Sequence, residues 1–364
     1  MRTTPHSRSF GRVFLAALAF AAAAQSADQV FAPDVNGRVW TIAVQPDGKI
    51  LIGGEFTQVN GVGQAYVARL YPDGSLDTSF SPTFSGVSQS DVPVIRRILV
   101  IGNDDILVAG NFAKVNGHTQ YDFVRLSVGG ITSPGFISNA DRGSMCIALE
   151  KTKDGHYLVG TPTAILKFDA NGANEQVFAT VNSVPSRILE LADGQIVVAG
   201  PSTVNGTTVK NLLRLNGAGQ LDTNFLPAVP SAVFDVVVSN GNYIAGTGSG
   251  LYNGSLANVM KFTPTGTLPG DFSPPFGNNY AADIEVLPDG RILAAGTTLT
   301  PGVWRLDSSG SYDDTFPTVT LNGHVFALYV LSSGQFLVGG DFTSVNGQPR
   351  NRLARLDIAG SLET

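Results

Sequence analysis

An all-β fold made of seven tandem repeats is predicted by three features of the sequence. The first is a hairpin signal, most often Asp-Gly or Asn-Gly between two apolar runs, where a type I′ turn requires positive φ. The second is a Gly followed six residues later by Phe, as in RLYPDGSLDTSF at 69–80 and RLNGAGQLDTNF at 214–225. The third is composition, because 42 Gly residues and only 14% charged residues are typical of dense β-structure.

The hairpin signal recurs along the whole chain and sets the repeat length. Its seven positions are 47–48, 103, 154–155, 193–194, 240–241, 289–290 and 333–334. Each repeat divides into four short strands, which in the first copy are VWTIAVQ, KILIGG, YVARLY and SLDTSF. Four-stranded units of this length, with no helical period between them, predict a seven-bladed β-propeller of four-stranded antiparallel blades. The propeller is expected over 25–364, with repeats at about 37–84, 92–138, 143–180, 184–228, 231–275, 279–317 and 322–364.

The two ends of the chain both carry a copy of the fourth strand. SADQVF at 26–31 aligns with SLDTSF at 75–80, so an N-terminal strand is expected to complete the seventh blade and close the ring. The last repeat ends in SLET at 361–364, which begins a competing copy. Either one of the two copies closes the ring, or the native chain continues beyond 364.

The N-terminal segment differs from the repeats and reads as a secretory signal peptide. Three Arg residues precede the apolar run VFLAALAFAAAA at 13–24, which is too short for a transmembrane helix. Cleavage is predicted after residue 24, with residue 27 as the alternative. A secreted, periplasmic or cell-surface location follows, with no membrane insertion after the signal is removed.

Charge and cysteine content narrow the classes of partner. The formal net charge is −6, and the longest basic run is the pair Arg96-Arg97, so a nucleic-acid surface is not expected. Cys146 is the only cysteine, so no internal disulfide can form. No cofactor motif is present, and His118, His156 and His324 lack the spacing of a zinc site, so neither a cofactor nor a metal is predicted.

The pattern PDGKILIGGEFTQVNG followed by VARLYPDGSLDTSF resembles the delta-60 repeat, a β-propeller repeat of secreted and surface proteins of bacteria. The match is close at 39–80 and 325–362, fair at 95–136 and 187–225, and degraded in the other three repeats. The resemblance covers nearly all of the chain after the signal peptide. It implies a propeller, expected here as a monomer, and an exported location, and it carries no established activity and no catalytic residues.

Candidate site residues come from the start of each repeat's first strand. The residues entering these strands include Arg38, Tyr280 and His324, which blades 1, 6 and 7 would bring together at the mouth of the central channel. Three residues further in, the same strands carry Asp283 and the pair Arg187 and Asp235. The pair falls on adjacent blades, so it is interpreted as a structural ion pair. Solvated loop residues are the alternative interpretation of Arg38, Tyr280 and His324.

A second group of candidates follows the Gly-Gly of the second strand. Glu55 and Asp341 occupy this position in blades 1 and 7, which become neighbours when the ring closes. They lie at the start of the loop between the second and third strands. These loops and the connections between blades vary more than the Gly turns on the opposite face, so they form the predicted binding face.

The sequence is compatible with three functions. The first is a non-catalytic exported scaffold that binds a protein or a glycan, supported by the uniform repeats and the absence of a catalytic motif. The second is a hydrolase or lyase that acts on polysaccharide at the channel mouth, which would need the His, Tyr and acid residues to converge there. The third is a structural segment of a larger surface adhesin.

Overall fold

The computed structural model describes residues 30–86, 88, 91–102, 104–133, 135–136, 145–173, 176–252, 255–274, 280–297 and 301–363. The predicted signal peptide at 1–24 lies outside these residues. Every regular element in the described part of the chain is a β-strand. The predicted all-β class is therefore confirmed.

Seven sheets follow one plan, in which a first strand pairs with a second and the second with a third, all antiparallel. The first three are β1 (Val39–Val44), β2 (Ile50–Gly54) and β5 (Val67–Leu70); β7 (Val94–Gly102), β8 (Asp105–Asn111) and β11 (Phe123–Leu126); and β12 (Leu149–Lys151), β13 (Tyr157–Gly160), β14 (Ala164–Phe168) and β15 (Gln176–Thr180). The next two are β16 (Arg187–Glu190), β17 (Ile196–Ala199) and β20 (Leu212–Leu215); and β21 (Val233–Ser239), β22 (Asn242–Tyr252) and β23 (Ser255–Phe262). The last two are β24 (Tyr280–Val286), β25 (Ile292–Thr297), β26 (Gly302–Leu306) and β27 (Val319–Thr320); and β28 (Val325–Val330), β29 (Phe336–Gly340) and β32 (Leu353–Leu356).

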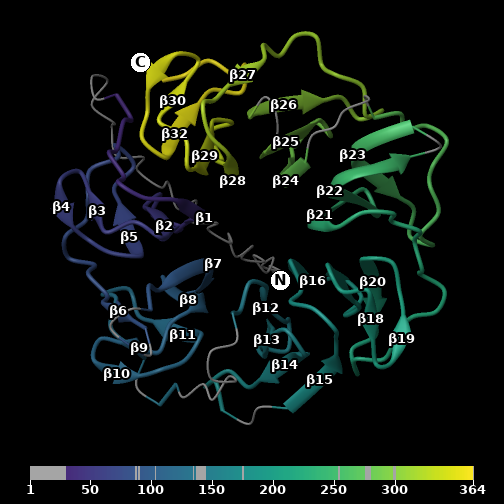
Figure 1. Cartoon of the computed structure of the whole chain (residues 1–364), viewed down its shortest axis with the longest axis horizontal. Helices are drawn as coiled ribbons and strands as arrows, with labels where there is room; N and C mark the ends of the chain where they lie inside the picture. Colours follow the sequence, from purple (N-terminus) through teal and green to yellow (C-terminus); the bar gives the residue numbers. More distant parts are fainter. Residues whose placement is uncertain are drawn as a thin grey trace, which may run out of the picture.

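The sheets are arranged around a central axis, with the first strand of each sheet nearest to that axis (Figure 1). The first and last sheets lie side by side (Figure 1), and apolar residues of both share one buried cluster that includes Val39 and Leu337. Similar clusters fill the spaces between other neighbouring sheets. The core of the molecule is therefore divided into layers between sheets, which is the arrangement of a propeller.

The Asp-Gly turns between first and second strands are tight, but they are not the predicted type I′ turns. Gly48 N donates to Gln45 O at 2.9 Å and Gln45 N donates to Lys49 O at 2.9 Å. Gly48 has φ of 85°, whereas Asp47 is outside the left-handed region. This is a three-residue loop, a type I turn followed by a left-handed Gly, so the type I′ prediction is wrong here. The type I′ prediction is correct at Asn240-Gly241, where both residues have positive φ, 49° and 76°.

The Val-Asn-Gly segments, predicted as part of a variable loop face, form small fixed hairpins. Asn60 and Gly61 have φ of 52° and 75°, which gives a type I′ turn between β3 (Gln58–Val59) and β4 (Val62–Gly63). Asn60 Oδ1 accepts a hydrogen bond from Asp34 N at 2.8 Å, and Asn60 Nδ2 donates to Gly74 O at 3.1 Å. The corresponding elements are β6 (Phe84–Ser85), β9 (Lys114–Val115), β10 (His118–Thr119), β18 (Thr203–Val204), β19 (Thr207–Thr208), β30 (Ser344–Val345) and β31 (Gln348–Pro349). These hairpins are rigid connectors between neighbouring repeats.

The outermost segment of most repeats differs from the predicted fourth strand. Two of the seven sheets, β12–β15 and β24–β27, contain four strands within the described residues. In the first repeat the segment makes only an isolated bridge, between Leu70 and Leu76. Asp77 follows this bridge, and its Oδ1 accepts a hydrogen bond from Ser79 N at 3.1 Å, so the chain turns there. Asp313 makes the same bond to Thr315 N in the sixth repeat, where the fourth strand, β27, comes after the predicted segment.

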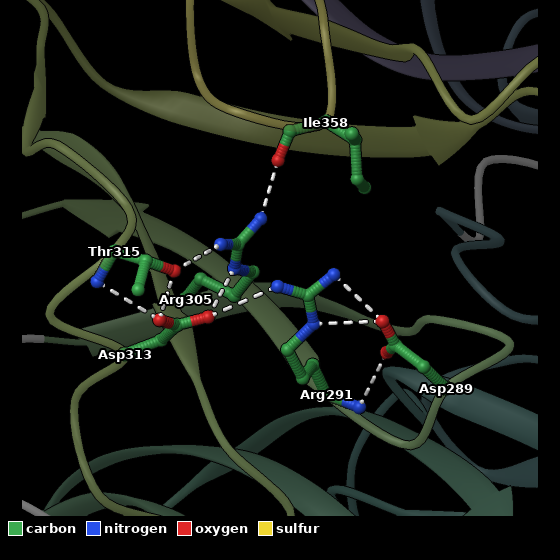
Figure 2. Close-up of polar contacts among 6 residues, drawn as sticks. All are labelled: Asp289, Arg291, Arg305, Asp313, Thr315 and Ile358. Carbon is green, nitrogen blue, oxygen red and sulfur yellow. Dashed lines mark hydrogen bonds and ion pairs between the residues drawn. The ribbon is translucent and has the colours of Figure 1, made fainter.

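A buried Arg joins this outer segment to the next repeat. Figure 2 shows Arg305, whose Nε donates to Asp313 Oδ2 at 2.8 Å and whose Nη1 donates to the carbonyl oxygen of Ile358 in the following repeat. Hydrogen bonds from Thr315 and from Arg305 and Arg291 hold the pKa of Asp313 well below its usual range. Other repeats use Arg in the same way, with contacts to the next repeat from Arg69 to Val128 O at 2.5 Å, Arg214 to Pro264 O at 2.9 Å and Arg355 to Pro72 O at 2.6 Å.

In the last repeat both ends of the described chain meet at Arg355. Its Nε lies 2.5 Å from Glu363 Oε2, so Glu363 takes the place of Asp77 in the first repeat. Its guanidinium lies 4.4 Å from the ring centroid of Phe31, as Arg69 lies 4.6 Å from Phe80. The competing copies of the fourth strand are therefore used together, with the acid taken from 361–363 and the Phe from the N-terminal segment.

Candidate functional site

A pocket of about 730 Å³ lies on the central axis and is lined by the first strands of the sheets. Its wall comes mainly from β1, β7, β21, β24 and β28, with Ile147, Ser186 and Arg187 on the remaining side. This volume falls within the usual range of roughly 300–1,000 Å³ for ligand pockets. The end of the pocket at which the first strands begin is called the mouth below.

Five of the first strands contain a β-bulge close to the mouth. The register shifts lie between Val39 and Thr41, Ile95 and Arg97, Val233 and Asp235, Ala281 and Asp283, and Val325 and Ala327. A bulge adds one residue to a strand and re-aims its side chain. The added residues are Trp40, Arg96, Phe234, Ala282 and Phe326, and all five line the pocket. They are called the bulge ring.

The bulge ring is the part of the mouth that was not predicted from the sequence. The predicted columns were the residues entering the first strands and those three positions further in, which lie on either side of the bulge. The available signal was an aromatic or Arg residue one position before Thr41, Arg97, Asp235 and Ala327. In a regular strand these side chains would point into the spaces between the sheets. The two-residue alternation of side chains therefore does not indicate that they line the pocket.

Four predicted site residues are brought together above the bulge ring, from the first and last sheets. Arg38 Nη1 lies 3.4 Å from Glu55 Oε2, and Arg38 Nε lies 3.7 Å from Asp341 Oδ2. His324 Nδ1 lies 3.4 Å from the same Asp341 oxygen. The side chains of Arg38 and His324 are 51% and 50% exposed, so their polar groups face solvent. Arg38, His324, Glu55 and Asp341 are called the rim cluster.

Trp40 connects the rim cluster to the bulge ring. Its Nε1 donates to Glu55 Oε1 at 2.9 Å. Phe326 stacks on the indole with ring centroids 3.9 Å apart, and the Arg96 guanidinium lies 3.7 Å from the indole ring centroid. Burial lowers the pKa of Arg96 and the nearby charge of Arg38 lowers it further, against a rise caused by Glu55. Trp40 is thus a packed support for the mouth and for the cations around it.

Tyr280, the remaining predicted residue of the entering column, pairs with a different neighbour. Its ring packs edge-to-face with Phe234 of the preceding sheet, with centroids 5.9 Å apart. The backbone of Gly248 lies against Tyr280, because a Cβ at that position would come within 3.3 Å of two ring carbons. Both aromatic residues are partly exposed, Phe234 at 39% and Tyr280 at 43%. They form a supported apolar surface on the side of the mouth formed by β21 and β24.

Asp283 and Asp235 hold neighbouring first strands together. Asp283 Oδ2 accepts a hydrogen bond from Leu328 N at 2.6 Å, and Asp235 Oδ2 accepts one from Ile284 N at 3.4 Å. Each acceptor thus binds a backbone N–H of the next sheet's innermost strand, which is an edge strand with unpaired donors. Arg187 Nε lies 3.5 Å from Asp235 Oδ1, so the predicted pair is also in contact.

Two acids of this region, Asp283 and Glu285, have raised pKa values. Burial raises the pKa of Asp283 well above its usual value, and the charges of Asp235 and Glu285 raise it further. Burial also raises the pKa of Glu285 to about 7, with a further rise caused by Asp235 and a reduction caused by Arg187. The inner part of the pocket therefore holds at least one acid, Glu285, that is partly protonated at neutral pH.

Among the residues that the structure describes, no group of three or more His, Cys, Asp or Glu side chains is placed to hold a metal ion. The same part of the chain contains no helix long and apolar enough to cross a membrane.

Sequence comparisons connect the repeats to a known family model. Four segments, 45–80, 191–225, 287–316 and 331–364, match a domain of unknown function described as a β-propeller, DUF5122. They fall in the first, fourth, sixth and seventh repeats and contain the Asp-Gly or Ser-Gly turn and the Arg that follows it. A search of curated proteins finds no match to this chain.

Solved structures with a similar fold are distant in sequence. The extracellular domain of a one-component system from B. thetaiotaomicron is 15% identical with a TM-score of 0.57; the match covers 87% of this chain but only 39% of that one. The WD40 β-propeller domain of Doa1 is 15% identical with a TM-score of 0.56, over 86% and 93% of the two chains. Virginiamycin B lyase from Staphylococcus aureus is 13% identical with a TM-score of 0.54, over 86% and 97%.

These likenesses concern the fold, because identities of this size do not carry activity from one protein to another. The β-propeller described by the family model agrees with the sheets around the central axis and with the WD40 neighbour. The matches therefore support a β-propeller repeat family for this chain.

Proposed function

We propose that the protein is an exported, non-catalytic binding scaffold whose ligand is a glycan held at the mouth of the central pocket. The observation that carries this proposal is the mouth itself, where the Phe234–Tyr280 surface faces a pocket of about 730 Å³ below the half-exposed Arg38 and His324. Aromatic rings stack on the apolar faces of sugars, and polar groups around them orient the hydroxyls. A concave site of this kind suits a sugar chain better than a broad protein surface.

The scaffold we propose is a closed ring of seven blades, in which the outer segment of each repeat serves as a fourth strand. Its support is the repeated Arg contact to the following repeat, which also occurs from Arg355 to Pro72, that is, from the last repeat to the first. Asn351 Nδ2 donates to Asp34 Oδ1 at 2.8 Å across the same junction. Closure would hold the rim cluster in place, because the cluster takes residues from both of these sheets.

Export is proposed from the N-terminal segment of the sequence. Its basic start and short apolar run are those of a secretory signal peptide. The extracellular domains among the structural neighbours support the same location.

Tyr280→Ala is expected to weaken glycan binding by roughly tenfold, the usual scale for an aromatic residue at the centre of a binding site. The experiment screens the purified protein on a glycan array and then titrates the best binder by calorimetry. Tyr312→Ala is the matched control, because Tyr312 is 49% exposed but lies on the outer segment of its repeat. Equal loss in both variants, or no binder on the array and a protein ligand instead, would contradict the proposal.

One contact favours a second candidate, an enzyme acting on polysaccharide at the same mouth. His324 Nδ1 lies 3.4 Å from Asp341 Oδ2, and a carboxylate behind a His is a common way to orient a general base. Under this candidate, polysaccharide is cleaved on prolonged incubation and the His324→Gln variant loses the cleavage. Under the proposed scaffold, bound glycan is recovered intact from both proteins.

A further inference from the structure

The Arg38 and His324 side chains at the mouth have N–H groups that the neighbouring carboxylates do not fully use. Glu55 receives a hydrogen bond from Trp40 Nε1 at 2.9 Å, and Asp341 receives one from His324 N at 2.6 Å. The ion-pair distances from Arg38 and from the His324 side chain to these carboxylates are longer, at 3.4–3.7 Å. Each acid makes its short bond through one oxygen and faces the guanidinium or the imidazole with the other at a longer distance, so the half-exposed Arg38 and His324 keep N–H groups for other partners.

Arg96 adds a second guanidinium just below the rim. It lies on Trp40 and lines the pocket, and its buried Nε has no hydrogen-bond partner among the described atoms. A buried donor without a partner is costly, and an anion that reaches it would remove that cost. Arg38 and Arg96 also repel each other, and an anionic group placed near both would stabilise them. The Arg38 side of the mouth is therefore suited to a negatively charged group.

The side of the mouth formed by β21 and β24, together with the floor, suits a sugar ring with hydroxyls. Phe234 and Tyr280 present the apolar surface described above, supported from behind by Gly248. Deeper in the pocket lie the carboxyl groups of Asp235, Asp283 and Glu285. Carboxyl oxygens accept hydrogen bonds from hydroxyls but repel a second anion. A ligand is thus expected to place its negative charge at the rim and its neutral hydroxyls at the floor of the pocket.

We infer that the glycan bound at this mouth is an acidic one, with a sugar ring on Tyr280 and Phe234 and its carboxylate at Arg38, His324 and Arg96. This inference rests on the proposed function and adds the chemical class of the ligand. A uronic acid residue has the required form, since one face of its ring is apolar, its hydroxyls point outward and its carboxylate is fixed to the ring. A planar anion without a ring face, or a neutral sugar, would use only one side of the mouth.

The test compares two probes that differ only in charge: a tetrasaccharide of galacturonic acid and the same tetrasaccharide with its carboxyl groups reduced to alcohols. Binding of each is measured by calorimetry at one ionic strength to wild type and to Arg38→Gln. Wild type is expected to bind the acidic probe about tenfold more tightly, since charge-assisted hydrogen bonds are roughly twice as strong as neutral ones. Arg38→Gln is expected to weaken binding of the acidic probe much more than binding of the reduced probe, so that most of the difference between the two probes disappears.

Lys114→Gln is the matched control, because Lys114 is an exposed cation on β9, outside the residues that line the pocket. It should leave both affinities unchanged, whereas an equal loss in this variant would show that general surface charge attracts the acidic probe and would overturn the inference. Equal binding of the two probes by wild type would overturn the acidic ligand and leave the glycan-binding scaffold intact. Binding of neither probe, together with an empty glycan array, would overturn both.

Discussion

Phe31→Ala is expected to lower the free energy of unfolding by about 3–5 kcal/mol, the range for truncating a buried Phe. Phe31 is completely buried and shares a core cluster with Val39 of the first sheet and Leu353 of the last. The Arg355 guanidinium lies over its ring, so the variant loses this contact as well as the apolar one. Since small domains are stable by only about 5–15 kcal/mol, a single side chain near the N-terminus would decide much of the stability.

The measurement is urea unfolding of wild type, Phe31→Ala and Phe31→Leu, with Phe80→Ala as the matched control. Phe80 has the same Arg contact inside the chain and is equally buried, so its truncation should cost a similar amount. Phe31→Leu should cost about 1 kcal/mol because it keeps most of the volume, and it stays measurable if the Ala variant fails to fold. If Phe80→Ala lowered the free energy of unfolding by the expected amount and Phe31→Ala lowered it by less than about 1 kcal/mol, the ring would not be closed between the first and last sheets.

The part that could be predicted from the sequence is the part that repeats. Copies of one pattern must adopt one local structure, so the strands, the Gly turns and the alignment of Phe31 with Phe80 follow from comparison within the chain. The role of the two end segments could not be chosen in this way, because SADQVF and SLET are both credible copies. The structure uses Glu363 from one and Phe31 from the other, since Arg355 has room for an acid and a ring.

The candidate site was predicted less completely, for a reason of strand geometry. The expected convergence of Arg38 with His324, and of Glu55 with Asp341, follows from closure of the ring, and the structure places these four together. Tyr280 was expected beside Arg38 and His324, but its ring packs on Phe234. Trp40 and its equivalents were missed because a bulge shifts the alternation of inward and outward side chains by one residue. A bulge depends on how the strand meets its neighbours, and it has no residue pattern of its own in a single sequence.

Glu285→Gln is expected to stabilise the protein by about 2 kcal/mol at pH 8 and to change it little at pH 5. The pKa of Glu285 is about 7 in the folded protein, whereas an unfolded Glu titrates near 4.3. The folded state therefore holds the proton more tightly, and stability from this group is lost as the pH rises from about 4 to about 7. The full difference corresponds to roughly 4 kcal/mol at 1.36 kcal/mol per pKa unit, and exposure to the pocket reduces it.

The carboxylates on the outer segments change stability in the opposite direction. Asp77, Asp222, Asp313 and Glu363 have lowered pKa values because of hydrogen bonds from Ser, Thr, Asn or Arg neighbours, so their contribution is lost as the pH falls below about 4. The pocket acids destabilise the fold as the pH rises, and the outer carboxylates stop stabilising it as the pH falls. The protein is therefore expected to be most stable near pH 5. Asp283 also has a raised pKa, so Glu285→Gln should remove only part of the loss at high pH.

The experiment compares urea unfolding of wild type and Glu285→Gln at pH 5 and pH 8. Asp271→Asn is the control, because the Asp271 side chain is 76% exposed and should give the same change at both pH values. A loss of stability in Glu285→Gln at pH 8 would mean that the ionised carboxylate is well paired, and the raised pKa would be wrong. A gain at pH 8 alone would show that the pocket keeps an acid which weakens the fold. Such a residue is expected where a ligand's hydroxyls supply the missing hydrogen bonds.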